Sequence, residues 1–600
     1  MTIIEKILAS HAGKAKVNPG DIVDVTIDVR LARDFGGAGV VKNLQSNNLG
    51  IADPNRTFFT FDCNPTGSDQ QYAANQQKCR VYARENHIRV YDINTGIGTH
   101  LALEEGLAVP GSTLVSTDSH ANIVGAIGAF GQGMGDRDIA AAWARGAVWF
   151  KVPESVKVTL MGERPPMLKA KDIALNLLKK FGADTLLGCA VELYGDEVEK
   201  LSLDERITIS SMATEMGAIA VLFTPSEEVI AYCKSRSYTL FAPVYADKDT
   251  SYLHEYALDL EQYAPAVSMP GQPHHVRFVR DVKGTKIDSV FIGSCTNGRM
   301  EDMREAANIL RERKVAPGVV LKIVPATDEI WNACLHEGII EIFKAAGALF
   351  GNAGCAGCAS GQIGQNGPGE RTVSTGNRNF EGKQGKGEVY LASVATAAAS
   401  AVAGHLTTED DIPDKPTLYT EAAKVIKPEV QPATPANPKT ILEGRVWLVE
   451  GDNIDTDMIY HNQHLAITDL REMGKFAFGN LAGWEDFASK AAPGDIVITG
   501  RNFGSGSSRQ QAVDCFRSLQ VQAILAMSFG AIYERNAINA GFPVLTYASL
   551  HDLDLANGDV ISMDLENATI TNKKNNKKVS VSPFSEVQMM IYKKGDLLKM

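Results

Sequence analysis

The sequence predicts an α/β protein with a long N-terminal region and a smaller C-terminal domain. From Gly20 to Val402, short apolar runs alternate with helical stretches, which is typical of α/β layers with largely parallel sheets. Between about Thr407 and Thr440, six prolines crowd a segment with few aromatic residues, which predicts an extended, semi-rigid linker. A second α/β pattern begins at Gly444 and continues to the C-terminus. The predicted boundaries are 1–405 for the N-terminal region, 406–440 for the linker and 441–600 for the C-terminal domain.

The composition of the 600 residues is that of a globular protein. Hydrophobic residues make up 44% and charged residues 22%, and no apolar run is long enough to cross a bilayer. The formal net charge of -12 disfavours a general nucleic-acid binder, because phosphate contacts need a clustered excess of Lys and Arg. We therefore expect neither a membrane nor a nucleic acid as partner.

The N-terminus and the cysteine content indicate a reducing compartment. Residues Met1 to Leu8 carry an early acid and an amphipathic pattern, which suits a first helix better than a signal or transit peptide. Nine cysteines are an odd number and are spread thinly, so we expect reduced thiols rather than a disulfide framework. The sequence therefore predicts a cytoplasmic protein.

Polar residues follow the apolar run that ends at Ser116. Asp118, Ser119 and His120 come directly after this predicted strand, and His100 lies upstream. In open α/β sheets, ligands bind at the carboxyl ends of the strands, so these positions are candidates for a site. A lone histidine is more often structural, and the four residues need independent support.

Three cysteines lie in two glycine-flanked loops. Cys295 follows the apolar run 287–292, and the pair Cys355 and Cys358 lies between Gly351 and Gly361. Small flanking residues let the backbone approach a bulky inorganic group, and thiolates are the usual ligands of iron–sulfur clusters. A single CxxC also fits a redox pair or half of a zinc site. A closed zinc site needs four ligands, and the sequence has no second CxxC or close Cys/His pair.

Three thiolates would leave one iron of a [4Fe–4S] cluster without a protein ligand. Such an open iron is a Lewis acid that can polarise the C–O bond of a hydroxyl group. Five further cysteines resemble ordinary small buried residues: Cys79, Cys189, Cys233, Cys334 and Cys515.

Two other loops could bind anions. Arg378 and Lys383 belong to a turn that, in isolation, also fits a solvated charged loop. In the C-terminal domain, the apolar run 495–499 leads into a Gly/Ser turn with Ser507, Ser508 and Arg509, followed by a helix start. Helix N-termini bind anions, and an arginine adds a fork for carboxylates. A phosphate-binding or merely structural turn fits this pattern as well.

Five of these motifs occur together in one order along the chain. They are the loop 293–299, the Gly-Cys-x-x-Cys loop at 354–358, the stretch 377–380, the triplet 455–457 and the loop 506–509. With them the chain resembles the aconitase superfamily, specifically the isopropylmalate isomerase and homoaconitase branch with its small subunit fused at the C-terminus. The resemblance covers nearly the whole chain. It implies three α/β subdomains that carry the cluster and a swivel domain that closes over it.

The resemblance also implies roles for individual residues. Cys295, Cys355 and Cys358 would ligate the [4Fe–4S] cluster, and Ser507 would be the base that removes a proton next to a carboxylate. A serine is a poor base unless its alkoxide is stabilised, which backbone N–H groups and Arg509 could do. The groups that shape hydrogen bonds around the open iron would be Asp118, Ser119, His120, His100 and Glu215. Substrate carboxylates would be held by Arg378, Ser508 and Arg509, with Asp457 orienting the swivel side.

Four positions depart from the family pattern. Where the family has an Asp-His pair that protonates the leaving hydroxyl, this chain has Asp62 and Cys63. A thiol with a pKa of about 8.5 could donate a proton, with a different geometry. A family Gln or His becomes Arg33, an Asn becomes Ser211 and a carboxylate-binding Arg becomes Lys383. Because Lys383 lacks bidentate geometry and Arg33 adds a guanidinium, we expect the carboxylate clamp to be rearranged rather than lost, for an altered substrate.

These observations predict a hydro-lyase that works as a monomer. It would reversibly dehydrate or isomerise a small 2-hydroxy di- or tricarboxylic acid. The alternative is a non-catalytic [4Fe–4S] sensor or structural protein in which Cys63 closes the fourth iron. Iron-dependent RNA binding by a cluster-free form is disfavoured by the acidic balance of the chain.

Overall fold

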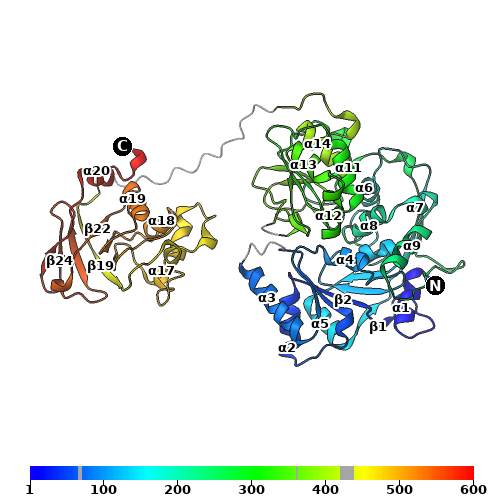
Figure 1. Cartoon of the computed structure of the whole chain (residues 1–600), viewed down its shortest axis with the longest axis horizontal. Helices are drawn as coiled ribbons and strands as arrows, with labels where there is room; N and C mark the ends of the chain where they lie inside the picture. Colours follow the sequence, from blue (N-terminus) through cyan, green and yellow to red (C-terminus); the bar gives the residue numbers. More distant parts are fainter. Residues whose placement is uncertain (65–69, 360–361, 419–437, 508, 600) are drawn as a thin grey trace. The chain divides into compact units, whose positions relative to one another are not determined.

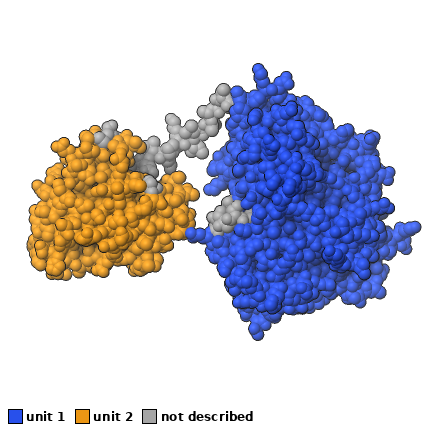
Figure 2. Space-filling model, viewed as in Figure 1, with its two compact units in different colours: residues 1–421 blue, residues 422–600 orange. Residues whose placement is uncertain are grey.

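The computed structural model describes residues 1–64, 70–359, 362–418, 438–507 and 509–599. The chain divides into two compact units, residues 1–421 (unit 1) and 422–600 (unit 2), shown in Figure 1 and coloured separately in Figure 2. Unit 1 combines helices with largely parallel sheets and unit 2 combines helices with one mixed sheet, so the α/β prediction is confirmed. Most of the predicted linker, residues 419–437, lies outside the described ranges. Within those ranges, no helix combines the length and apolar character that a membrane span needs.

Unit 1 begins with the predicted N-terminal helix, α1 (Ile3–His11). The Thr2 hydroxyl accepts a hydrogen bond from the Glu5 backbone, and the Glu5 side chain accepts one from the Thr2 backbone. This capping box starts the helix, and the apolar residues of α1 are buried. Two strands, β1 (Ile22–Thr26) and β7 (Ala147–Lys151), form an antiparallel pair.

The first sheet of unit 1 has five parallel strands in the order β4-β3-β2-β5-β6. Their bounds are Arg89–Tyr91 for β4, Thr57–Thr60 for β3, Val29–Arg33 for β2, Thr113–Ser116 for β5 and Phe130–Gly133 for β6. Every residue of β2, β3 and β5 is buried, as expected for a parallel sheet covered on both faces. The carboxyl ends of these three strands lead to Asp34, Asp62 and Asp118, so three loops with acidic residues lie at one edge.

A second sheet has four parallel strands in the order β10-β9-β8-β11. Their bounds are Ala220–Phe223 for β10, Ala190–Tyr194 for β9, Ser155–Met161 for β8 and His254–Asp259 for β11. Two helices of this region, α6 (Ala170–Phe181) and α8 (Leu203–Ser211), lie side by side (Figure 1). Residues 170–178 of α6 are all buried, including the charged Lys171 and Asp172, which is unusual and requires internal partners.

The third sheet has seven strands in the order β13-β12-β18-β17-β14-β15-β16. The parallel strands are β18 (Glu388–Leu391), β17 (Arg371–Ser374), β14 (Ser289–Ile292), β15 (Val320–Ile323) and β16 (Leu349–Phe350). The antiparallel strands are β12 (Ala266–Ser268) and β13 (Val276–Phe278). The buried, Ala-rich helix α14 (Val394–Ala403) packs on β14 and on α11 (Met300–Leu310). The loops after β14, β16 and β17 carry Cys295, Cys355 with Cys358, and Arg378.

Unit 2 is built on one seven-stranded sheet in the order β22-β21-β20-β19-β23-β24-β25. Its parallel half contains β22 (Val544–Thr546), β21 (Ala523–Ala526), β20 (Ile496–Thr499) and β19 (Ile441–Val449). Its antiparallel half contains β23 (Val560–Asp564), β24 (Thr569–Asn572) and β25 (Lys578–Ser580). Two helices matter for the site, α18 (Gln511–Ser518) and α19 (Ala531–Asn539). The serine loop connects β20 to α18, so the predicted strand, turn and helix are all present.

Candidate active site

The loop of Cys295 is shaped by a glycine that a larger residue could not replace. Gly293 has a φ of 150°, and a Cβ added there would come within 2.6 Å of the Val324 carbonyl oxygen. The chain therefore turns sharply after β14 and buries Cys295, of which 1% is exposed. The Cys295 thiol donates a hydrogen bond to Oδ1 of Asn377 at 3.3 Å, which joins the loops that follow β14 and β17.

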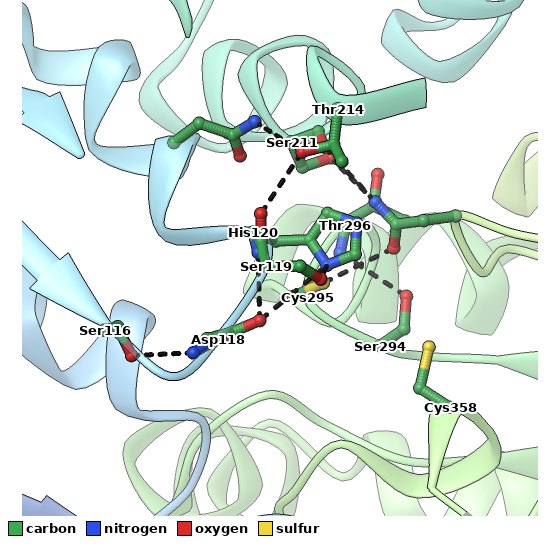
Figure 3. A network of polar contacts seen from close by, with 12 residues as sticks. Ser116, Asp118, Ser119, His120, Ser211, Thr214, Ser294, Cys295, Thr296 and Cys358 are labelled. Atoms are coloured by element: carbon green, nitrogen blue, oxygen red, sulfur yellow. Dashed lines mark hydrogen bonds and ion pairs between the residues drawn. The ribbon is translucent and has the colours of Figure 1, made fainter. Parts of the chain in front are cut away.

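The CxxC loop is tied to the first sheet. The backbone N–H of Cys355 donates to the Asp62 carbonyl at 2.9 Å, so the loops after β16 and β3 meet. The side chains of Cys355 and Cys358 are hydrogen-bonded to each other, which lowers the pKa of Cys358, and the nearby charge of Lys383 acts in the same direction. Figure 3 shows the Cys358 side chain pointing toward the loop that carries Ser294 and Cys295. Three thiols from two loops thus face one region of unit 1.

The donor set fits an iron–sulfur cluster better than a single ion. In the described residues, the carboxylates and thiol of Asp34, Asp62 and Cys63 are the group tight enough for one metal ion. Asp34 instead accepts the backbone N–H groups of Asp62 and Cys63 at 3.3 and 3.0 Å, and this group is a hydrogen-bonded turn. The thiols of Cys295, Cys355 and Cys358 do not form such a tight group. Thiolates are the usual ligands of multi-iron clusters.

Arg33 is the centre of a buried ion-pair cluster. Its Nε donates to Asp62 Oδ1 at 2.7 Å, and its NH1 nitrogen lies 3.2 Å from Asp118 Oδ1. Burial raises the pKa of Asp62 to about 6 although Arg33 opposes the shift. Burial acts in the same way on Asp118, but there the Arg33 charge and the hydrogen bonds from His120 prevail and lower the pKa. Two neighbouring carboxyl groups therefore differ in acidity.

A second cluster joins His120, Glu215 and Arg378. Nε2 of His120 lies 3.1 Å from Glu215 Oε1, to which Nε of Arg378 donates at 2.8 Å. Burial alone would lower the pKa of His120, but the negative charges around it, first Cys295 and then Glu215, raise it. The hydroxyl of Ser119 is 3.4 Å from Nδ1 of His120, as Figure 3 shows. Within the described residues, the terminal nitrogens of Arg378 have no hydrogen-bond partner.

His100 supports the cysteine loop from the other side. It belongs to α4 (Gly98–Glu104), and its Nε2 forms a 2.9 Å hydrogen bond with the Cys295 carbonyl oxygen. Burial and the positive charge of Arg299 lower the pKa of His100 to about 3, so the ring is neutral near pH 7. The neutral ring can donate to the carbonyl through Nε2 and keep Nδ1 as an acceptor.

Four of the predicted site residues hold a buried polar atom with no hydrogen-bond partner in the part of the chain that the structure describes. These atoms are NH2 of Arg33, Nδ1 of His100, Oδ2 of Asp118 and Oε2 of Glu215. Leaving such atoms unpaired is costly, and native structures do so at few positions. All four residues surround the three thiols. Their concentration there indicates a site that a bound group completes.

The four departures from the family pattern have the following surroundings. Cys63 is 5% exposed, and its thiol donates to Asp62 Oδ1 at 3.5 Å. Burial raises the pKa of this thiol, which therefore remains protonated near pH 7. Lys383 donates to the Cys358 carbonyl oxygen at 3.1 Å, and the Ser211 hydroxyl donates to the Thr208 carbonyl oxygen. Arg33 and Lys383, which we expected to share a substrate carboxylate, are both engaged with protein groups, and only Arg33 retains an unpaired buried nitrogen.

Sequence reasoning missed Lys171 in α6. Its Nζ lies 2.9 Å from the Gly376 carbonyl oxygen, 3.3 Å from that of Thr375 and 3.4 Å from the Thr296 hydroxyl. Thr296 follows Cys295, and Gly376 precedes Asn377, so Lys171 joins the two loops that the Cys295 thiol also joins. The available signal was a lysine in the first turn of an otherwise apolar helix, which is usually a solvated position.

The serine loop of unit 2 is open to solvent. Ser507 is exposed, and its hydroxyl has no hydrogen-bond partner in the described residues, although its carbonyl oxygen accepts a bond from Thr456 at 3.0 Å. Arg509 pairs with the Asp457 carboxylate and donates to the Tyr460 carbonyl oxygen at 3.0 Å. Asp457, which we expected to orient groups of the swivel domain, is therefore in contact with Arg509 of this loop. Ser508, predicted to bind a carboxylate, lies outside the described residues.

A glycine also sets the shape of the serine loop. Gly504 has a φ of 74°, and a Cβ there would lie 2.2 Å from Cγ of Tyr533 in α19. Only a residue without a side chain lets the loop pass this close to the ring. The loop is therefore anchored on α19 at Gly504 before it reaches Ser507.

Two family models match the chain. The model of the aconitase family (aconitate hydratase) matches residues 5–404, and the model of the aconitase C-terminal domain matches residues 449–549. The probable 3-isopropylmalate dehydratase large subunit of Methanothermobacter thermautotrophicus is 40% identical over 413 residues, 68% of this chain and 98% of that relative. The homoaconitase large subunit of Thermus thermophilus is 39% identical over 417 residues, 69% of this chain and 98% of that relative.

Proposed function

The chain belongs to the aconitase family and is a hydro-lyase, and we propose that it removes water reversibly from a small 2-hydroxy di- or tricarboxylic acid. The observation that carries this proposal is the set of four buried polar atoms, unpaired within the described residues, near the buried Cys295 and Cys355 and the half-buried Cys358. The NH2 group of Arg33 is a donor and can pair with a carboxylate oxygen, whereas Nδ1 of His100, Oδ2 of Asp118 and Oε2 of Glu215 are acceptors and can pair with a hydroxyl oxygen that carries a proton. A carboxylate and a hydroxyl on adjacent carbons provide these oxygens.

The proposed cofactor is a [4Fe–4S] cluster held by Cys295, Cys355 and Cys358. When bound, it supplies a Lewis acid that weakens the C–O bond of the leaving hydroxyl group. The chemistry of three thiols, two of them buried and one half-buried, supports this choice. The protein's own residues then have three tasks, which are to hold the carboxylates, to handle the proton of the leaving group and to remove a proton from carbon.

Arg378 is the proposed carboxylate clamp of unit 1. Its Nε is fixed by Glu215, its two terminal nitrogens have no partner among the described residues, and its side chain is 24% exposed. A guanidinium held in this way can offer its two free nitrogens to one carboxylate. Lys383 contributes positive charge to the same loop, but it has no second pair of nitrogens with which to bind a carboxylate.

Asp62 is the proposed proton donor to the leaving hydroxyl. Its pKa of about 6 lies close to neutral pH, where a group exchanges protons most effectively. The Cys63 thiol, whose pKa is raised, remains protonated and donates a hydrogen bond to Asp62. Arg33 orients both Asp62 and Asp118. Asp118, Ser119, His120, His100 and Glu215 complete the polar lining.

Ser507 of unit 2 is the proposed base that takes the proton from the carbon next to a carboxylate. Its hydroxyl is exposed and has no partner in the described part of the chain, which supports this role. Arg509, held by Asp457, and the backbone N–H groups of the loop would stabilise the alkoxide. Ser508 stays a predicted carboxylate ligand. Because one chain matches both family models, we propose a monomer, to be checked by sedimentation of the purified protein.

The function is tested by a dehydration assay. The protein is reconstituted with iron and sulfide under anaerobic conditions and offered citrate, homocitrate, isopropylmalate and methylated malates, while ultraviolet absorbance follows the conjugated alkene. We expect turnover of at least one acid, and Ser507→Ala to abolish it at unchanged iron content. A reconstituted cluster without turnover of any acid would contradict the proposal.

Cys63 separates this proposal from the sensor alternative. A catalytic cluster loses one iron on mild oxidation, and Cys63→Ser should leave this loss unchanged, because in this proposal the Cys63 thiol is a hydrogen-bond donor to Asp62 and not an iron ligand. If Cys63 closed the cluster, the unmodified protein would keep all its iron on mild oxidation. Only the Cys63→Ser variant would then have a labile iron. Electron paramagnetic resonance of the oxidised samples distinguishes the two results.

A further inference from the structure

Lys171 is a buried cation without a buried anion beside it. Its residue exposure is 1%, and its Nζ contacts two backbone carbonyl oxygens, one hydroxyl and the Met212 sulfur. In the described ranges of the chain, no carboxylate oxygen comes within 4.0 Å of this nitrogen. A charge taken out of water without a partner of opposite charge is strongly unfavourable.

Lys169, two residues earlier, shows how the same region treats an ordinary lysine. Its ammonium lies 3.1 Å from Glu305 and 3.1 Å from Glu409, and its side chain is 28% exposed. The two lysines lie at the start of one helix, yet only Lys171 points into the interior without a carboxylate. Local sequence therefore does not explain why a charge is kept at position 171.

The atoms around Lys171 belong to the two loops that meet at Cys295. Thr296 is the next residue after Cys295, and Gly376 precedes Asn377, the acceptor of the Cys295 thiol. The acidic groups with the largest electrostatic influence on Lys171 are Glu215, Cys295, Asp302 and Cys358. Two of these four groups are thiols that carry negative charge only when they are ionised.

We propose that Lys171 is a positioning residue whose ammonium fixes the Cys295 and Asn377 loops and offsets the negative charge of the thiolates when the cluster is bound. This inference rests on the proposed function, because it needs a cluster held by those thiolates. Its consequence is a reciprocal linkage: the cluster stabilises a protein that contains Lys171 more than one that lacks the charge.

The test compares Lys171→Met with Lys169→Met in the full chain. Methionine keeps the length and most of the volume of the aliphatic stem and removes the charge. For each protein, the thermal unfolding midpoint is measured in the iron-free and the reconstituted form. We expect Lys171→Met to lose about half or more of the iron-dependent rise in the midpoint, and Lys169→Met to retain all of it. We also expect Lys171→Met to retain roughly threefold less iron after gel filtration.

The reduction potential of the cluster gives a second readout that a merely structural role would not move. Removing a nearby positive charge disfavours the reduced cluster, so Lys171→Met should shift the potential to a more negative value. Lys169→Met, whose charge is already paired, should leave the potential unchanged.

Each result bears on one of the two proposals. If the unmodified protein binds no cluster, the proposed function fails first. If the unmodified protein binds a cluster, and Lys171→Met shows the same iron-dependent rise in the unfolding midpoint and the same reduction potential as the unmodified protein, the inference about Lys171 is wrong. An equal loss of stability in the iron-free and reconstituted forms would assign Lys171 a purely structural role and would also overturn it. If Lys171→Met does not fold, Lys171→Gln, which keeps a hydrogen-bond donor, is measured in the same way.

Discussion

The polar lining of unit 1 and the serine loop of unit 2 are built in opposite ways. In unit 1 the functional side chains are buried and already paired with one another, as Arg33 is with Asp62 and Asp118. In unit 2 Ser507 is exposed and its hydroxyl is unpaired within the described residues. The difference teaches that unit 1 sets the charges and proton affinities of its polar lining through buried contacts, whereas unit 2 leaves the hydroxyl of its proposed base exposed to solvent.

The largest expected effect is the loss of a thiol. Cys295→Ala should abolish both iron binding and activity, because two thiolates cannot hold the cluster in place of three. Iron and sulfide analysis, followed by the dehydration assay, checks this. Cys515→Ala, a buried cysteine of unit 2 far from any predicted role, is the control and should keep both properties. Full activity of Cys295→Ala would remove the basis for assigning the cofactor to unit 1.

Removing the serine should give the next largest effect. Ser507→Ala should lower kcat by about 10²- to 10⁴-fold, the usual contribution of a positioned base, while KM and iron content change little. Ser505→Ala in the same loop is the matched control, since the Ser505 carbonyl oxygen, which accepts from Thr456, is unaffected. A normal kcat for Ser507→Ala would mean that the base comes from unit 1, and would contradict the proposal that the two units supply different catalytic groups.

A smaller effect is expected at the carboxylate clamp. Arg378→Lys keeps the charge but loses the two-nitrogen fork, and we expect kcat/KM to fall by roughly 10- to 100-fold, mainly through KM. Arg371→Lys, at the exposed start of β17, should have no effect. Steady-state kinetics on the best acid of the panel measures both. An Arg378→Lys enzyme with unchanged KM would place the clamp elsewhere.

The smallest expected effect is a difference in pH dependence between the units. In unit 1, burial raises the pKa of Asp172 to about 7 and that of Asp302 to about 8, from 3.8 in the unfolded chain. Between these values the folded state binds more protons than the unfolded state, so its stability falls as the pH rises from about 4 to about 8.

In unit 2 the sign is opposite. Hydrogen bonds from Asn567 lower the pKa of Asp564, and Arg445 lowers that of Asp495 against the effect of burial, so stability is lost only as the pH falls below their unfolded value of 3.8. Hydrogen exchange of β14 and β20, corrected for intrinsic rates, should therefore show weaker protection at pH 8 than at pH 6 in β14 alone. Equal protection of β14 at both values would contradict the assignment.

The fold was largely predictable because its signals are local. Buried strands such as β5 and β14 are continuous apolar runs, and glycine-rich turns mark where they end. The cysteine and serine loops follow such strands, so their place at a sheet edge could be inferred. The resemblance to the aconitase superfamily is confirmed by the match of both family models.

The partners of the site residues could not be predicted in the same way. Arg33, Asp62 and Asp118 come from three strands, and only the strand order β3-β2-β5 explains why they meet. We expected Arg33 to bind substrate because sequence gives no sign of two buried carboxylates beside it. Lys171 was also missed. A charged residue in the first turn of a helix usually faces water, and the sequence does not show that this one is buried.

The turn that Asp34 makes has a consequence for how this enzyme could diversify. Asp34 fixes the backbone at positions 62 and 63 through N–H groups, which every residue type except proline possesses. These hydrogen bonds therefore do not depend on the identity of the side chain at position 63, provided that it fits the buried space that Cys63 occupies. The residue at position 63 could therefore change during evolution without other changes in the loop, so that a change of substrate at this position would have little effect on folding.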